Sequence, residues 1–150
     1  MDLVIRGAAI YDGKGGAPFQ GDVAVKDGRI AAVGKVAETG AEEIDATGLA
    51  LMPGIIDSHT HFDAQITWDP GCTPSPELGV TSVLIGNCGF TIAPCREPDR
   101  DLIMKNLVQV EGMSLDVLRG GIKWDFETFP QYLDMLEAQG SVMNVGAFLG

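Results

Sequence analysis

The first fifty residues alternate short apolar runs with turn residues, a pattern typical of β-strands joined by tight loops. Asp27-Gly28 stands between two such runs, and an Asp-Gly pair in that position is the strongest short-range signal for a β-hairpin. We expect this part of the chain to be β-rich, like a piece of a small sandwich or barrel. Strands are predicted over residues 3–11, 22–26, 29–33, 42–45 and 49–52.

The rest of the chain mixes strands with helices. Residues 80–85 form a compact run rich in β-branched side chains, as in a buried strand. Helical spacing then predicts a helix with Ile103, Leu107 and Val110 on its apolar stripe. Further helices are predicted over 114–121 and 128–140, and a last strand over 142–149. This order of elements indicates an α/β domain with a mainly parallel sheet.

The two histidines of the chain, His59 and His61, stand two positions apart after the apolar pair Ile55-Ile56. The apolar approach suits a strand buried on both faces, and alternation along such a strand puts both imidazoles on one face with Asp57 and Asp63. Neutral imidazole nitrogens suit zinc and similar ions. We therefore interpret the histidines as metal ligands and the aspartates as carboxylates that orient their rings.

Structural alternatives exist for each of these residues. The histidine pair is also compatible with a hydrogen-bonded feature of a strand end, and either aspartate with a cap or turn residue.

Cys88 follows the predicted strand 80–85, within the turn 86–89. Sites in parallel α/β sheets gather at the carboxyl ends of strands, so a thiolate there can join the histidines on a metal. The alternative for Cys88 is a buried, inert thiol. Cys72 and Cys95 lie near prolines, and we interpret both as ordinary thiols.

Composition narrows the classes of protein. A net charge of −11 argues against a nucleic-acid partner, because such proteins carry basic patches. No apolar run approaches the ~20 residues of a membrane span, and Met1-Asp2-Leu3-Val4 lacks the basic segment of a signal peptide. The three cysteines show no Cys-x-x-Cys spacing, which favours a reduced, cytoplasmic setting. The oligomeric state is not readable from the sequence.

Two stretches resemble a known family. Residues 53–61, PGIIDSHTH, are similar to the first barrel strand of the amidohydrolase superfamily. Residues 79–90, GVTSVLIGNCGF, narrow the resemblance to the N-acyl-D-amino-acid deacylases (D-aminoacylases), as do residues 122–130, IKWDFETFP. The resemblance implies an α/β fold in which residues 1–54 are a small β-sandwich segment. Residues 55–150 would then be the first strands and helices of a (β/α)8 barrel.

The resemblance also implies a chemistry. His59, His61 and Cys88 would be zinc ligands, with Cys88 in the place that a modified lysine often fills elsewhere in the superfamily and able to bridge two metal positions. The reaction would be zinc-dependent hydrolysis of the linear amide of a small N-acyl-D-amino acid by activated water. The resemblance therefore implies a hydrolase of carbon–nitrogen bonds other than peptide bonds.

A (β/α)8 barrel takes about 250 residues, whereas the sequence offers three candidate barrel strands. We therefore expect an N-terminal portion of a deacylase that is inactive alone. The family's later histidine ligands and its catalytic aspartate would lie after Gly150, so we assign no catalytic residue within the chain. One rival reading is a cyclic-amide hydrolase of the dihydroorotase or hydantoinase kind, against which the cysteine in turn 86–89 argues. Another is a non-catalytic fragment that binds metal or pairs with a partner.

Overall fold

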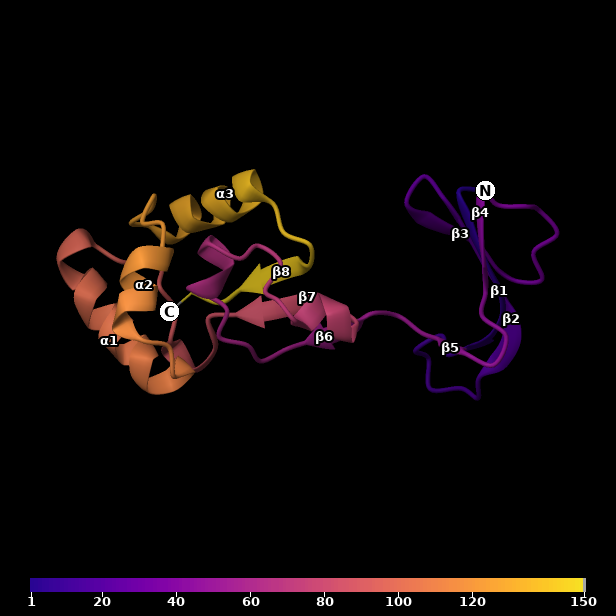
Figure 1. Ribbon diagram of the computed structural model, residues 1–150, viewed down its shortest axis with the longest axis horizontal. Coiled ribbons are helices and arrows are strands. Elements are labelled where there is room, and N and C mark those ends of the chain that lie inside the picture. Colours follow the sequence, from indigo (N-terminus) through magenta and orange to yellow (C-terminus); the bar gives the residue numbers. More distant parts are fainter. Residues whose placement is uncertain (150) are drawn as a thin grey trace. The chain divides into compact units, whose positions relative to one another are not determined.

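The computed structural model describes residues 1–149, and the chain divides into two compact units (Figure 1). The first unit is Met1–Pro53 and the second begins at Gly54. Among the described residues, no helix combines the length and apolar character needed to cross a membrane. We describe each unit by itself.

The first unit is built on one five-stranded sheet with the order β3-β2-β1-β4, in which β5 also pairs with β1. Neighbours β1, β2 and β3 are antiparallel, while β4 and β5 run parallel to β1. Asp27 and Gly28 both have positive φ at the β2–β3 turn, so the predicted hairpin is confirmed. The described residues of this unit form a single sheet, and a sandwich stays a prediction. The strands are β1 (Leu3–Ile10), β2 (Phe19–Lys26), β3 (Arg29–Gly34), β4 (Glu42–Asp45) and β5 (Ala50–Leu51).

A charged network fastens the middle of this sheet. The guanidinium of Arg6 lies 2.7 Å from a carboxylate oxygen of Glu43 and 3.4 Å from one of Asp22. The Asp22 carboxylate also accepts the backbone N–H groups of Gly7, at 2.9 Å, and Val36, at 3.4 Å. These hydrogen bonds to the charged form, led by the one from Gly7, lower the pKa of Asp22.

The second unit carries a three-stranded parallel sheet in the order β6-β7-β8. The predicted order of two strands, helices and a strand is confirmed. Figure 1 shows α1 and α2 beyond the carboxyl end of β7. The strands are β6 (Ile55–Asp57), β7 (Val80–Ile85) and β8 (Asn144–Ala147), and the helices are α1 (Arg100–Glu111), α2 (Leu115–Gly121) and α3 (Phe129–Gln139). Short 3-10 turns cover Gln65–Thr67, Ser75–Leu78, Asn87–Gly89 and Glu97–Asp99.

Apolar side chains from both strands and helices form the core of the second unit. Ile85 on β7, Leu107 on α1 and Leu118 on α2 are fully buried or nearly so. Helix α3 contributes Tyr132, which is fully buried, and begins with the predicted capping box at Thr128. This core packs β7 against the helices that follow it.

Two expectations about burial are wrong. The approach to the histidines is not a strand buried on both faces, since Ile55 and Ile56 on β6 are 50% and 69% exposed. The reason is that β6 is the edge strand of this sheet and pairs with β7 alone. On α1, Met104 and Leu107 are the buried residues, while Val110 is exposed. The buried face of this helix is therefore rotated relative to the predicted stripe.

Candidate metal centre

The chain leaves β6 at Asp57, so both histidines lie in the loop after the strand rather than on it. The carboxylate of Asp57 accepts the backbone N–H of His59 at 3.2 Å, as a turn residue does. Thr60 then donates both its backbone N–H and its hydroxyl to the carbonyl of Leu84, at 3.1 and 2.7 Å. The histidine loop is thereby fixed to the end of β7.

Cys88 lies in the turn that follows β7. Gly86, Cys88 and Gly89 all have left-handed backbones, with φ of 80°, 58° and 75°. This conformation is uncommon for a residue with a side chain and is found preferentially at functional sites. The side-chain amide of Asn87 donates to the carbonyls of Thr60, at 3.2 Å, and Leu84, at 2.8 Å, which joins the cysteine turn to the histidine loop.

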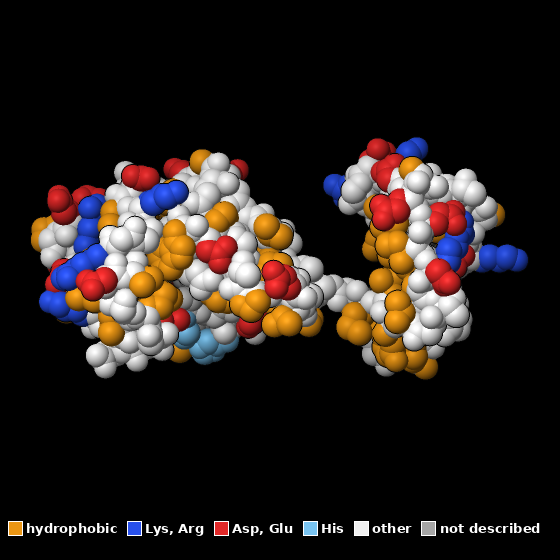
Figure 2. Space-filling model, in the orientation of Figure 1, with side chains coloured by type: hydrophobic (Ala, Val, Ile, Leu, Met, Phe, Trp, Pro, Cys, Tyr) orange, Lys and Arg blue, Asp and Glu red, His pale blue; other side chains and the backbone are white. Residues whose placement is uncertain are grey.

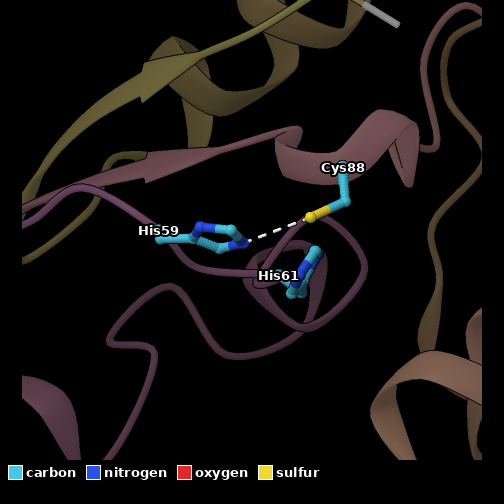
Figure 3. A group of neighbouring side chains, drawn as sticks. All are labelled: His59, His61 and Cys88. Atoms are coloured by element: carbon cyan, nitrogen blue, oxygen red, sulfur yellow. Dashed lines mark hydrogen bonds between the residues drawn. The ribbon is translucent and has the colours of Figure 1, made fainter.

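The structure brings His59, His61 and Cys88 together from these two loops (Figure 3). One ligand atom from each residue lies within 4.8 Å of the other two. The Cys88 sulfur is 3.2 Å from Nε2 of His59, and the two imidazole rings meet edge to face with centroids 5.4 Å apart. His59 and Cys88 are exposed, and Figure 2 shows the histidines on an open face of the molecule.

These three residues fit a zinc ion by chemistry and by spacing. Two imidazoles and a thiolate are a donor set that zinc prefers. Ligands held at 2.0–2.3 Å from one tetrahedral ion lie about 3–4 Å from one another, which is close to the observed spacing. The three residues also sit at the carboxyl ends of β6 and β7, where a parallel sheet presents its sites. Their role as ligands stays a prediction.

Asp63 is fully buried and connects the two loops that carry the candidate ligands. One of its carboxylate oxygens accepts the backbone N–H of Gly86 at 3.0 Å, and its backbone carbonyl accepts the hydroxyl of Tyr132 at 2.9 Å. Burial raises the pKa of Asp63, although the hydrogen bond from Gly86 opposes that rise. The carboxylate therefore links the histidine loop to the cysteine turn through the backbone, and its described hydrogen bond does not go to an imidazole.

Glu111 is a residue of this site that sequence reasoning missed. Its Oε1 lies 3.7 Å from Nδ1 of His61, and the two side chains are 16% and 21% exposed. Burial raises the pKa of Glu111, and attraction to His61 opposes that rise. Glu111 continues the buried face of α1 after Met104 and Leu107, at helical spacing. An acidic residue in register with a buried stripe was the signal that could have found it.

The other two cysteines lie apart from this cluster. Cys72 and Cys95 are buried, and all three cysteines of the chain are free thiols. Burial raises the pKa of Cys72 to about 12 and also raises the pKa of Cys95. Thiolates are the reactive and metal-binding form of cysteine, so these two groups are poor ligand candidates beside the exposed Cys88.

Comparisons with known proteins show which family the chain belongs to. The model described as "Amidohydrolase family" matches residues 42–147, and the chain belongs to this family. The match includes the histidine loop, the cysteine turn and all three helices of the second unit.

Several of the similar proteins are deacylases. The chain is 40% identical, over 150 residues, to an N-acyl-D-aspartate deacylase of Alcaligenes xylosoxydans, a match that covers 99% of this chain and 28% of the relative. A crystal structure of D-aminoacylase superimposes with a TM-score of 0.79 at 32% identity, covering 99% of this chain and 29% of that one. An N-acyl-D-glutamate deacylase of Bordetella bronchiseptica, solved with zinc and a phosphonate inhibitor, gives a TM-score of 0.77 at 32% identity over the same shares. The chain thus spans less than a third of these relatives.

Proposed function

We propose that this chain provides part of the metal centre of a zinc-dependent amidohydrolase that cleaves the linear amide of N-acyl-D-amino acids. The observation that carries the proposal is the convergence of His59, His61 and Cys88, with ligand atoms within 4.8 Å, at the carboxyl ends of two parallel strands. The likeness to an N-acyl-D-aspartate deacylase over nearly the whole chain supports the substrate class.

In this proposal each residue of the metal centre has a defined role. His59, His61 and Cys88 hold the ion, and Asn87 keeps the two loops that carry them together. When bound, zinc supplies a Lewis acid for the amide carbonyl and a means of activating water near neutral pH. The exposure of His59 and Cys88 leaves the ion's position open to a substrate.

The cysteine favours a linear amide over a cyclic one. The cyclic-amide hydrolases that share the histidine motif normally use a modified lysine, whereas the turn after β7 in this chain places Cys88 against His59. The lysine nearest in sequence, Lys105, instead forms an ion pair with Asp101 on α1. Hydrolysis of a cyclic amide is therefore the alternative, and assays of linear and cyclic amides side by side must exclude it.

We further propose that a polypeptide of these 150 residues has no deacylase activity by itself. The described residues supply three parallel strands and one cluster of three ligands. A (β/α)8 barrel needs eight strands to surround a substrate. Large apolar side chains of the second unit, such as Ile56, Leu78 and Val142, are also about 70% exposed, which favours association with further polypeptide.

Zinc binding by the 150-residue chain tests the ligand set directly. We expect the purified chain to bind Zn²⁺ and Cys88→Ala to lose most of that affinity, because a thiolate ligand is removed. Cys95→Ala is the matched control, since Cys95 is buried away from the cluster, and it should bind zinc like the unaltered chain. Equal zinc binding by the chain and by Cys88→Ala would refute the assignment.

A chimera tests the reaction. Replacing the matching N-terminal segment of the Alcaligenes N-acyl-D-aspartate deacylase with this chain should give an enzyme that hydrolyses N-acetyl-D-aspartate and not hydantoin. The same chimera with Cys88→Ala is the control and should lose activity, while the zinc-loaded 150-residue chain alone should release no D-aspartate. A folded, zinc-loaded chimera that opens hydantoin instead would favour the cyclic-amide alternative.

A further inference from the structure

We propose that Glu111 is a positioning residue for His61, whose Nδ1 proton its carboxylate accepts so that Nε2 is left free for the metal ion. The inference rests on the proposed function, because it takes His61 as a ligand. It adds to that function a residue from α1, an element that supplies none of the three ligands.

The two facing atoms have no other partner. Nδ1 of His61 and Oε1 of Glu111 are both buried, and neither makes a hydrogen bond within the described residues. They lie 3.7 Å apart, so a small side-chain rotation brings them to the ~2.8 Å of a charge-assisted hydrogen bond. Buried polar groups are nearly always paired, and these two unpaired atoms face each other at ion-pair distance.

The other neighbours of His61 do not compete for this proton. The ring of Phe90 meets His61 at a centroid distance of 6.1 Å and carries no acceptor atom. Nε2 of His59 is already 3.2 Å from the Cys88 sulfur. Glu111 is the one carboxylate within ion-pair distance of His61 in the part of the chain that the structure describes.

The position of Glu111 lowers the stability of the folded chain. A carboxylate in the last turn of a helix faces the negative end of the helix dipole, and Glu111 is the final residue of α1 before the left-handed Gly112. Partial burial of the carboxylate adds to that cost. A group that destabilises its own helix yet faces an imidazole indicates a role in the site rather than in the fold.

The physical consequence is a fixed tautomer and a more basic ligand. A carboxylate on one imidazole nitrogen holds the ring with its proton on that side and strengthens the other nitrogen as a donor to metal. Loss of such a partner typically weakens metal binding about 10–100-fold. His61 would then bind zinc less tightly without any change in the ligand set.

Nitrogen-15 NMR can test the tautomer because the chain has only two histidines. In the zinc-free chain at about pH 8, where ordinary imidazoles are neutral, we expect His61 to carry its proton on Nδ1. In Glu111→Leu the proton should distribute between the two nitrogens. Glu111→Gln keeps an acceptor of the same shape and should preserve more of the Nδ1–H form, which guards against a variant that merely misfolds.

Zinc titration supplies the second readout. Glu111→Leu should lower zinc affinity about 10–100-fold, and Glu111→Gln should lower it less. Glu137→Gln is the matched control, since Glu137 is an exposed helical glutamate on α3, and it should leave affinity unchanged. The zinc-free stability of Glu111→Gln should equal or exceed that of the unaltered chain, the opposite of what a purely structural glutamate would give.

The outcomes separate this inference from the proposed function. If His61→Ala weakens zinc binding while both Glu111 variants leave affinity and tautomer unchanged, the inference is overturned and the metal centre stands. If His61→Ala itself leaves zinc affinity unchanged, the proposed ligand set fails. A loss of zinc affinity in Glu111→Leu, together with a proton shared between the two nitrogens of His61 and smaller effects in Glu111→Gln, supports both.

Discussion

The sulfur of Cys88 lies 3.2 Å from Nε2 of His59, although 29 positions of sequence separate the two residues. Parallel pairing of β6 with β7 produces this contact, since it places the loops that follow the two strands side by side. Asn87 and Thr60 then hold the loops together through hydrogen bonds to Leu84 and to each other. The contact thus depends on strand pairing and on two side chains that join the loops, and its chemistry can be tested one group at a time.

Cys88 should be the reactive thiol of the chain. The thiolate is the nucleophile, and burial raises the pKa of Cys72 to about 12 and that of Cys95 in the same direction, whereas Cys88 is exposed. We expect iodoacetamide at about pH 8, where ordinary thiols begin to ionise, to label Cys88 much faster than the other two. Peptide mass spectrometry over a time course measures each rate.

Zinc supplies the control for this labelling. Saturating Zn²⁺ should slow alkylation of Cys88 because a coordinated sulfur is no longer a free nucleophile. In His59→Ala the protection should weaken, since one neighbouring ligand is removed. Rapid labelling of Cys88 at saturating zinc would contradict its assignment as a ligand.

Gly86 should tolerate a side chain less well than Gly89. Both have left-handed backbones, which cost a residue other than glycine about 1–2 kcal/mol. An added Cβ at Gly86 would lie 2.5 Å from the carbonyl oxygen of Phe148, whereas at Gly89 nothing lies within 4 Å. Gly86→Ala should therefore lower the free energy of unfolding by clearly more than Gly89→Ala, as measured by urea unfolding.

The same pair of variants tests the position of Cys88. Relief of the clash with Phe148 must move the turn that carries the cysteine, so Gly86→Ala should also weaken zinc binding in the molecules that remain folded. Gly89→Ala, with open space around the new methyl group, should change zinc affinity less. Equal stability losses in the two variants would show that the backbone conformation alone, and not the clash, limits residue 86.

Much of the second unit could be predicted because local signals and topology agree there. The β-branched run of β7, the capping box at Thr128 and the glycines around Cys88 each specify one local structure. Parallel strands then bring their carboxyl ends together, and so the proximity of the histidine loop and the cysteine turn followed from the order of elements. In the first unit, a local signal, the Asp27-Gly28 pair between two apolar runs, likewise predicted the hairpin.

The failures concern burial and contacts between elements. Whether Ile55 and Ile56 are covered depends on neighbours that a local pattern does not contain, and β6 is an edge strand here. The predicted apolar stripe of α1 included Val110, so Glu111 was not expected on the buried face that continues from Met104 and Leu107. The hydrogen bond that the Gly86 amide donates to Asp63 is likewise not predictable from the sequence, because backbone groups leave no residue-type signal.

Asp63 should matter for stability first and for zinc second. Asp63→Ala leaves the Gly86 N–H without its acceptor, and an unsatisfied buried donor costs about 1–3 kcal/mol. Loss of this link should also loosen the turn that carries Cys88, so zinc affinity should fall. Urea unfolding and zinc titration measure the two effects, and Asp134→Ala, at an exposed position on α3, is the control.

Asp22 should make the first unit sensitive to acid. Its pKa is lowered in the folded chain, chiefly by the hydrogen bond from the Gly7 amide and further by Val36 and Arg6. A carboxylate whose folded pKa lies below its unfolded value stabilises the fold above the unfolded pKa of about 3.9, and that stabilisation is lost as pH falls through the folded pKa. The stability of the sheet should therefore decline between about pH 5 and pH 2.

Asp22→Asn tests this account because it keeps the shape of the side chain and removes its titration. The variant should be less stable than the unaltered chain at pH 7, where Arg6 loses a charged partner, and its stability should decline less steeply on acidification. Glu43 has a lowered pKa as well, through its hydrogen bond from Arg6, so the slope should shrink rather than vanish. Urea unfolding followed by NMR through the Gly7 amide reports on this unit alone. Glu42→Gln is the control, since the Glu42 side chain is exposed. If stability falls with acid as steeply in Asp22→Asn as in Glu42→Gln, Asp22 is not the group responsible.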